Sequence, residues 1–297
     1  MITVRPDFYD RFKCRAALCR HSCCELWEID VDAAAAEYYM GLEGELGDEL
    51  RRSLSFKGGP HFELRGGRCP FLDADGLCRI IKELGEDSLC DICAEHPRFY
   101  NCFPGREELG LGLCCEEAAA LLTGSDESLK LIVSDDGEKD ETDEKAEALA
   151  ALRDELFAIL SDRDRDVFSR VDMALGLVGR PPFRFDPTYW NDRLLALERL
   201  DDSWGAMLSS LSGGADVASR FSEPRYERML EYFIYRHLIN AADMDEAGRV
   251  VEFCCLGAML VCALDCCDGA EPDEHLRMFS AEIEYSDENI GRIISAL

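Results

Sequence analysis

The second half of the chain has the pattern of amphipathic helices. From residue 146 onward, apolar residues recur at three- and four-residue spacing, which places them on one face of an α-helix. Pro187 and Pro224 each follow an acidic residue and suit the first turn of a helix. The pattern therefore predicts an all-α bundle of about six helices. The expected helices cover residues 146–162, 164–179, 186–211, 223–244, 246–267 and 280–297.

The first 124 residues have shorter and more varied patterns. Residues 31–56 predict a pair of helices, because they are rich in alanine and charged residues and are interrupted by glycines. Residues 61–69 are typical of a short strand, and residues 69–80 of a β-hairpin around an Asp-Ala-Asp-Gly turn. Short helices are expected at 80–85 and 114–124. The expected fold class is mainly α: an irregular cysteine-rich metal-binding N-terminal domain with short β-hairpins, followed by the all-α bundle.

An acidic segment separates these two parts. Residues 134–147 contain eight acidic and two basic residues and no aromatic residue, which is typical of a solvated linker or loop. We therefore expect a cysteine-rich domain at 1–124, an acidic linker or loop at 125–147, and a helical bundle at 148–297. Residues 1–24 have no sustained periodicity and are expected to form an irregular lead-in.

Composition and charge narrow the class of protein. The chain has 297 residues, of which 47% are hydrophobic, so a sizeable core is available. Its formal net charge of −29 argues against a nucleic-acid partner, since phosphate backbones require clustered Lys and Arg. The apolar stretch 254–267 is too short to span a bilayer, and the N-terminus lacks a long apolar run. We expect a soluble cytoplasmic protein with no membrane partner.

The sixteen cysteines change this picture most. Eleven lie within residues 14–115 and five within 254–267, with none between. In a reducing compartment, such clusters argue for metal binding or catalysis rather than disulfides. Thiolates separated by two to four residues are typical ligands of zinc and of iron–sulfur clusters. Each pair taken alone is also compatible with small buried hydrophobic residues, but four clusters in about a hundred residues favour a metal or cluster site within 14–115.

The N-terminal clusters differ in their spacing. The first is Cys14-x₄-Cys19-x₃-Cys23-Cys24, the second joins Cys69 and Cys78 across the expected hairpin, the third is Cys90-x₂-Cys93, and the last is Cys114-Cys115 before a helix. His21 and His96 lie among these cysteines as possible ligands or hydrogen-bond donors to them.

The C-terminal cysteines have a different pattern. Val251, Cys255, Cys262 and Cys266 are four, seven and four residues apart, which is the apolar stripe of a buried helix. We therefore expect these cysteines to pack in a core. The chain has no G-x-G-x-x-G loop after a strand, no P-loop, no G-x-S-x-G and no H-E-x-x-H motif.

The order of the cysteine motifs resembles the flagellin lysine-N-methylase family, which is related to the CxxCxxCC group of zinc- or iron-chelating domains. The motifs are "FKCRAALCRHSCCELWEI", "CPFLDADGLCRIIKELG", "LCDICAEHPR" and "LCCEEAAALL". The resemblance covers about the first 124 residues in detail. The metal ligands that it implies are Cys14, Cys19, Cys23, Cys24, Cys69, Cys78, Cys93 and Cys114.

This set of eight exceeds the need of one four-ligand site, so either two sites exist or some of the cysteines are structural. The family's C-P-E motif is Cys114-Cys115-Glu116 here, and its Phe-Pro-Arg turn is His96-Pro97-Arg98. By the same comparison Cys90, Cys102 and Cys115 are extra cysteines, and we do not expect them to be ligands.

The resemblance implies a protein-lysine methyltransferase. Its expected cofactors are S-adenosylmethionine and an iron–sulfur cluster, with 4Fe-4S favoured and zinc as the alternative. Its expected partner is a protein with exposed lysines, which is flagellin by resemblance. Neither a catalytic base nor a methyl-donor pocket can be assigned from the residues. Two other readings stay open: a non-enzymatic zinc- or iron-binding scaffold, and a redox sensor that uses Cys90 and Cys93 as a dithiol.

Overall fold

The computed structural model describes residues 1–137, 142–211, 216–267 and 273–297. The prediction of a mainly α chain is confirmed, although two small sheets accompany the helices. The chain forms two compact units, one of residues 13–98 and the other of residues 1–12 together with 99–297. We call them the 13–98 unit and the helical unit.

The 13–98 unit combines short helices with a three-stranded antiparallel sheet of order β2-β4-β3. The expected helix pair is present, and Asp32 caps its first helix by accepting a hydrogen bond from the Ala35 amide. The core contains Tyr39, Phe62 and Phe71, whose rings are in contact. The elements are β2 (Ile29–Asp30), α1 (Ala33–Gly41), α2 (Gly44–Ser53), β3 (Leu54–Ser55), β4 (His61–Phe62), α3 (Arg79–Leu84) and α4 (Asp91–Glu95).

The hairpin expected at 69–80 is reduced to a tight turn. Asp73 accepts hydrogen bonds from the amides of Asp75 and Leu77, and one isolated bridge joins Leu72 to Cys78. The chain enters α3 directly after this bridge. The side-chain chemistry of the turn was therefore predictable, whereas its flanks are too short to form strands.

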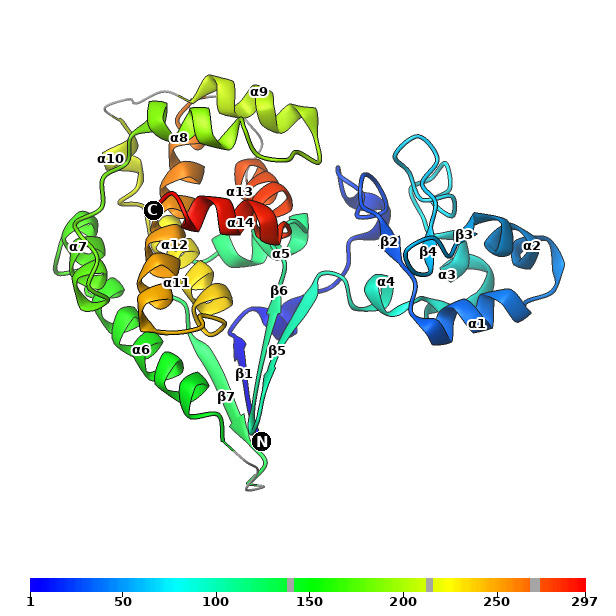
Figure 1. The fold of residues 1–297 in the computed structure, drawn as a ribbon, viewed down its shortest axis with the longest axis horizontal. Helices are drawn as coiled ribbons and strands as arrows, with labels where there is room; N and C mark the ends of the chain where they lie inside the picture. The colour runs from blue at the N-terminus through cyan, green and yellow to red at the C-terminus, as the bar shows by residue number, and fades with distance from the viewer. Residues whose placement is uncertain (138–141, 212–215, 268–272) are drawn as a thin grey trace. The chain divides into compact units, whose positions relative to one another are not determined.

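The helical unit contains a four-stranded sheet that the periodicity did not predict. Its order is β5-β6-β1-β7, in which β1 is parallel to β6 and antiparallel to β7 (Figure 1). The strands are β1 (Ile2–Pro6), β5 (Arg98–Phe103), β6 (Arg106–Leu111) and β7 (Leu131–Asp135). Residues 1–24, which were expected to be irregular, thus begin with β1, an inner strand of this sheet. The expected linker 125–147 contributes a strand and the start of a helix, and its residues 138–141 lie outside the described residues.

The helices of this unit follow the predicted positions with four differences, one of which is the unpredicted helix α13 at Glu274–Phe279. The segment expected as one helix at 186–211 forms two, a short helix follows near 216, and the last segment begins with a π-helical turn at Ser280–Glu284. The helices are α5 (Glu116–Thr123), α6 (Glu144–Leu160), α7 (Val167–Leu177), α8 (Pro187–Leu194), α9 (Asp202–Ser210), α10 (Asp216–Arg220), α11 (Pro224–Leu238), α12 (Met244–Asp265), α13 (Glu274–Phe279) and α14 (Asp287–Ile294).

Helix α12 is the central helix of this core and packs beside α11 (Figure 1). Among the described residues it is the one helix long and apolar enough to cross a bilayer, and 89% of its most apolar window is buried inside the protein. Cys255 and Cys262 are buried on it, as the apolar stripe predicts, and so is Cys254, whereas Cys266 of the stripe follows the last turn and is partly buried. Since β5, β6, β1 and β7 belong to the same unit as these helices, the division of the structure does not follow the predicted boundary at residue 124.

Candidate metal centre

Five thiols gather at the core of the 13–98 unit. Cys69 and Cys90 belong to its buried core, with 7% and 1% of their surface exposed. Cys24, Cys78 and Cys93 are partly buried and pack against the same core. These five cysteines come from four separate places in the sequence and all carry free thiols. We call them the thiol group.

Local backbone structure brings these residues together. The Cys69 amide donates a hydrogen bond to the Cys24 carbonyl over 2.8 Å, which joins the first cysteine cluster to the second. Cys78 and Cys90 are the residues that immediately precede α3 and α4. The Cys93 amide donates to the Cys90 carbonyl over 3.0 Å, so the C-x₂-C pair forms the first turn of α4.

The ionisation of the thiols reflects how closely they lie. A hydrogen bond from the Cys23 side chain lowers the pKa of Cys24 to about 7. The thiols of Cys90 and Cys93 are hydrogen-bonded to each other, which lowers the pKa of Cys90 and raises that of Cys93. Burial raises the pKa of Cys69 to about 12, with a further contribution from Cys24 and Cys78. Cys90 is thus the more readily ionised thiol of the C-x₂-C pair, and Cys24 ionises more readily than an ordinary thiol.

The donor set fits a thiophilic metal or cluster. Four or five cysteine sulfurs, buried and without disulfides, are the ligands that zinc and iron–sulfur clusters prefer. Within the described ranges, no three or more His, Cys, Asp or Glu side chains already have the arrangement of a metal site. The thiols are therefore neighbours, and binding would require their side chains to turn toward one ion or cluster and lose their protons.

Three of the expected ligands lie before the thiol group in the chain. Cys14 is exposed, and its sulfur accepts a hydrogen bond from the Ala16 amide. Cys19 is half-buried and Cys23 is exposed. Of these, Cys23 is linked to the thiol group through its hydrogen bond to Cys24. Cys23 and Cys24 thus differ in environment despite being adjacent.

Cys114, the last expected ligand, belongs to the helical unit. Burial raises the pKa of its thiol to about 12, while the Arg236 guanidinium and a hydrogen bond from Tyr285 lower it. Tyr285 immediately follows the π-helical turn. The structure therefore gives Cys114 neighbours of a different kind from those of the thiol group.

Cys90 was not among the expected ligands, but the structure places it in the thiol group. Its C-x₂-C spacing with Cys93 was visible, but the family resemblance made it an extra cysteine. In the structure Cys90 is buried, and its thiol is hydrogen-bonded to the Cys93 thiol. Of the two histidines considered as ligands, His21 is exposed, and burial lowers the pKa of His96 to about 4, so that its imidazole is neutral at neutral pH.

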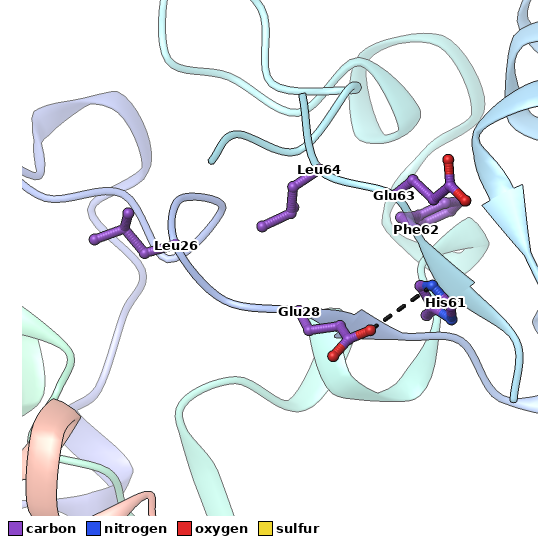
Figure 2. A pocket seen from close by; sticks show the side chains of 6 residues that line it. All are labelled: Leu26, Glu28, His61, Phe62, Glu63 and Leu64. Atoms are coloured by element: carbon purple, nitrogen blue, oxygen red, sulfur yellow. Dashed lines mark ion pairs between the residues drawn. The ribbon is translucent and has the colours of Figure 1, made fainter. Parts of the chain in front are cut away.

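The 13–98 unit also has a shallow pocket of about 490 Å³ beside β2 and β4. In Figure 2, Leu26 and Leu64 lie above Glu28, which an ion pair of 3.7 Å joins to His61. The Glu28 side chain is 73% exposed. The pocket is lined by Leu26, Glu28, His61, Phe62, Glu63 and Leu64. The carboxylates of Glu28 and Glu63 among the lining residues suit a ligand with a cationic end.

Comparison with known proteins gives distant relatives. The chain is 29% identical over 139 residues to a protein named lysine-N-methylase from Salmonella typhimurium, and 28% identical over 139 residues to a protein of the same name from Salmonella choleraesuis. It is 27% identical over 139 residues to the flagellar biosynthetic protein FliU of Salmonella muenchen.

These alignments cover 44% of the chain. They cover 35% of each lysine-N-methylase and 82% of FliU, so the chain matches about a third of the length of its first relatives. No family model matches the chain. No solved structure matches it. The similarity is to proteins of the kind that the cysteine motifs resemble.

Proposed function

We propose that this protein methylates lysine side chains of a protein substrate, with S-adenosylmethionine as the methyl donor and flagellin or a related protein as the acceptor. The observation that carries the proposal is the similarity to two proteins named lysine-N-methylase and to a flagellar biosynthetic protein. In this reaction the lysine nitrogen attacks the methyl carbon, the carbon–sulfur bond of the donor breaks, and S-adenosylhomocysteine leaves. The lysine must therefore lose its proton before the attack.

We further propose that the thiol group holds an iron–sulfur cluster, with 4Fe-4S favoured. Of the ligands expected from sequence, the four within the thiol group are Cys24, Cys69, Cys78 and Cys93. A cluster bound there would tie four separate segments of the 13–98 unit together and supply a one-electron redox centre. Methyl transfer from a sulfonium donor needs no electron, so the chain's own residues must bind the donor and deprotonate the lysine.

The charge of the chain supports a cationic substrate. A net charge of −29 attracts the ammonium form of lysine over a long range. The pocket in Figure 2 offers a docking place for such a side chain, with Leu26 and Leu64 beside its stem and Glu28 near its ammonium group. Docking there precedes deprotonation, because a carboxylate stabilises the charged form of lysine.

The test is to incubate the anaerobically purified protein with S-adenosylmethionine and purified flagellin, and to map methylated lysines by mass spectrometry. We expect methylated lysines only when protein and donor are both present. Binding of the donor should also raise the melting temperature of the protein in a concentration-dependent way. Absence of both methylation and thermal stabilisation at saturating donor would overturn the proposal.

A second function is favoured by the thiol group alone. Four or five buried cysteines form a structural zinc site as readily as a cluster site, and a zinc-binding scaffold needs no methyl-donor pocket. Metal content and an anaerobic absorption spectrum separate the two. A brown protein with iron and sulfide supports the cluster, whereas a colourless protein that carries zinc and does not respond to S-adenosylmethionine supports the scaffold.

A further inference from the structure

We propose that Cys90 is a ligand of the metal centre in the 13–98 unit, and that it binds together with Cys93 as a chelating C-x₂-C pair. The family resemblance makes Cys90 an extra cysteine, so this assignment comes from the fold of this chain. It rests on the metal-binding part of the proposed function and not on methyl transfer.

The first step of the argument is the geometry of the pair. Cys90 immediately precedes α4, and Cys93 lies in the first turn of that helix. The amide of Cys93 donates to the carbonyl of Cys90 over 3.0 Å, and the two thiols are hydrogen-bonded to each other. Residues three apart in a helical turn face the same side, so one ion can bind both sulfurs without a change of the backbone.

The second step is the position of the pair within the thiol group. Cys90 is close enough to Cys78 to interact with it electrostatically, and Cys93 interacts in the same way with Cys24 and Cys69. The pair therefore packs in the same core as the cysteine before α3 and the two cysteines joined by the Cys69–Cys24 backbone hydrogen bond. Cys90 and Cys93 are also the two members of the thiol group that lie closest in the chain, and their thiols are joined by a hydrogen bond.

The third step concerns burial. Cys90 has 1% of its surface exposed, and its thiol has a polar neighbour in Cys93 as well as the apolar core. A buried cysteine that only fills space behaves as a small hydrophobic residue, so replacing it lowers stability through a cavity or a buried hydroxyl but removes no bond to a metal. Replacing a ligand does remove such a bond, because its sulfur contributes a bond to the metal that neither methyl nor hydroxyl replaces. The two roles of Cys90 therefore predict different metal contents.

The experiment compares metal binding by Cys90→Ser, Cys90→Ala and Cys93→Ser with that of the unaltered protein. Each is purified anaerobically, reconstituted once with iron and sulfide and once with zinc, and assayed for bound metal and visible absorption. Cys102→Ser is the matched control, since Cys102 is an exposed cysteine on β5 in the helical unit. We expect Cys90→Ser and Cys90→Ala to lose metal to the same extent as Cys93→Ser, and the control to keep it.

Two further measurements distinguish the loss of a metal ligand from the loss of folding. Melting temperatures of the metal-free variants show whether each still folds, because a misfolded variant loses metal for another reason. In the unaltered protein, alkylation followed by peptide mapping should find Cys90 protected by bound metal, with Cys102 modified in both states. Full metal content in a folded Cys90 variant, or absence of metal from the unaltered protein, overturns the inference. Failure of methylation with metal still bound would affect the proposed function alone.

Discussion

At the scale of single residues, the adjacent cysteines 23 and 24 have different environments. Cys24 packs against the core of the 13–98 unit, whereas Cys23 is exposed and donates a hydrogen bond to it. A neighbouring thiol that donates to a thiolate stabilises the charged form. Cys23 therefore adjusts the reactivity of Cys24 without itself joining the thiol group.

Replacement of Cys23 by alanine should raise the pKa of Cys24 from about 7 toward the ordinary range of a thiol. At pH 7 the thiolate fraction then falls, so alkylation of Cys24 in the metal-free protein should slow by roughly tenfold. Peptide mapping after a timed pulse of iodoacetamide measures this rate, with the exposed Cys14 as the internal reference. An unchanged rate at Cys24 would contradict the role assigned to Cys23.

Helix α11 carries a carboxyl group that is buried in the helical unit. Glu231 is fully buried and accepts a hydrogen bond of 2.6 Å from the Leu129 amide. Burial raises its pKa to about 8, with a further contribution from Glu227. The folded state therefore keeps a proton that the unfolded state loses near pH 4, and stability contributed by this group falls as pH rises from about 4 to about 8.

The variant Glu231→Gln should remove this pH dependence. The free energy of unfolding of the variant minus that of the unaltered protein should increase by on the order of 2 kcal/mol from pH 5 to pH 8. The reason is that the variant has no carboxylate to bury at the higher pH. Urea unfolding at the two pH values measures the difference. Glu223→Gln is the control, since Glu223 is exposed beside the same helix. If the free energies of unfolding of Glu231→Gln and Glu223→Gln changed equally between the two pH values, the prediction would be wrong.

At the scale of elements, close packing of helices depends on residues that lack a side chain. Gly257 lies on the buried helix α12, where a Cβ atom would come within 2.7 Å of the Phe279 ring and 3.2 Å of the Phe233 ring. Both rings are buried, and their centroids are 5.3 Å apart. Gly291 lies on α14, where a Cβ atom would meet nothing within 4 Å.

The same substitution at these two glycines should have opposite effects. Gly257→Ala should lower the free energy of unfolding by about 1–3 kcal/mol, because the aromatic rings have to move in a packed core. Gly291→Ala should be neutral or stabilise by up to about 1 kcal/mol, since alanine favours a helix interior. Chemical denaturation of both variants measures this. If Gly257→Ala were as stable as Gly291→Ala, the contact between α12, α11 and α13 would be looser than described.

At the scale of the whole molecule, hydrogen bonds between residues far apart in the sequence hold the helical unit together. Arg228 on α11 is 1% exposed. Its guanidinium donates to Asp7 near the N-terminus over 2.5 Å and to the Leu122 carbonyl over 2.8 Å. Tyr235 on the same helix donates to the carbonyls of Val4 and Leu109, which belong to β1 and β6. Helix α11 thus fixes the inner strands of the sheet.

The variant Arg228→Leu should lower the free energy of unfolding by about 2–4 kcal/mol, because it leaves buried carbonyl groups and the Asp7 carboxylate without their donor. The control is Arg249→Leu, which removes an exposed ion pair with Asp245 and should change stability by less than about 0.5 kcal/mol. Urea unfolding monitored by circular dichroism compares them. A small effect at Arg228 would mean that water replaces its partners.

Sequence determined the features that depend on local spacing. Periodicity at three and four residues located α6, α7, α11 and α12, and it predicted that α12 is buried. An acidic residue followed by proline also predicted two helix starts, those of α8 and α11. Each of these signals acts over a few residues, so the amino-acid order alone carries it.

Tertiary structure decided the rest, because pairing between distant segments has no local signature. Strand β1 pairs with β6 and β7, more than a hundred residues away, and its five residues are too few for a pattern. The placement of Cys90 in the thiol group, and of Cys114 in the other unit, follows from how the chain returns on itself. Sequence determined which residues carry the sulfur chemistry, and only the fold decided which of them lie together.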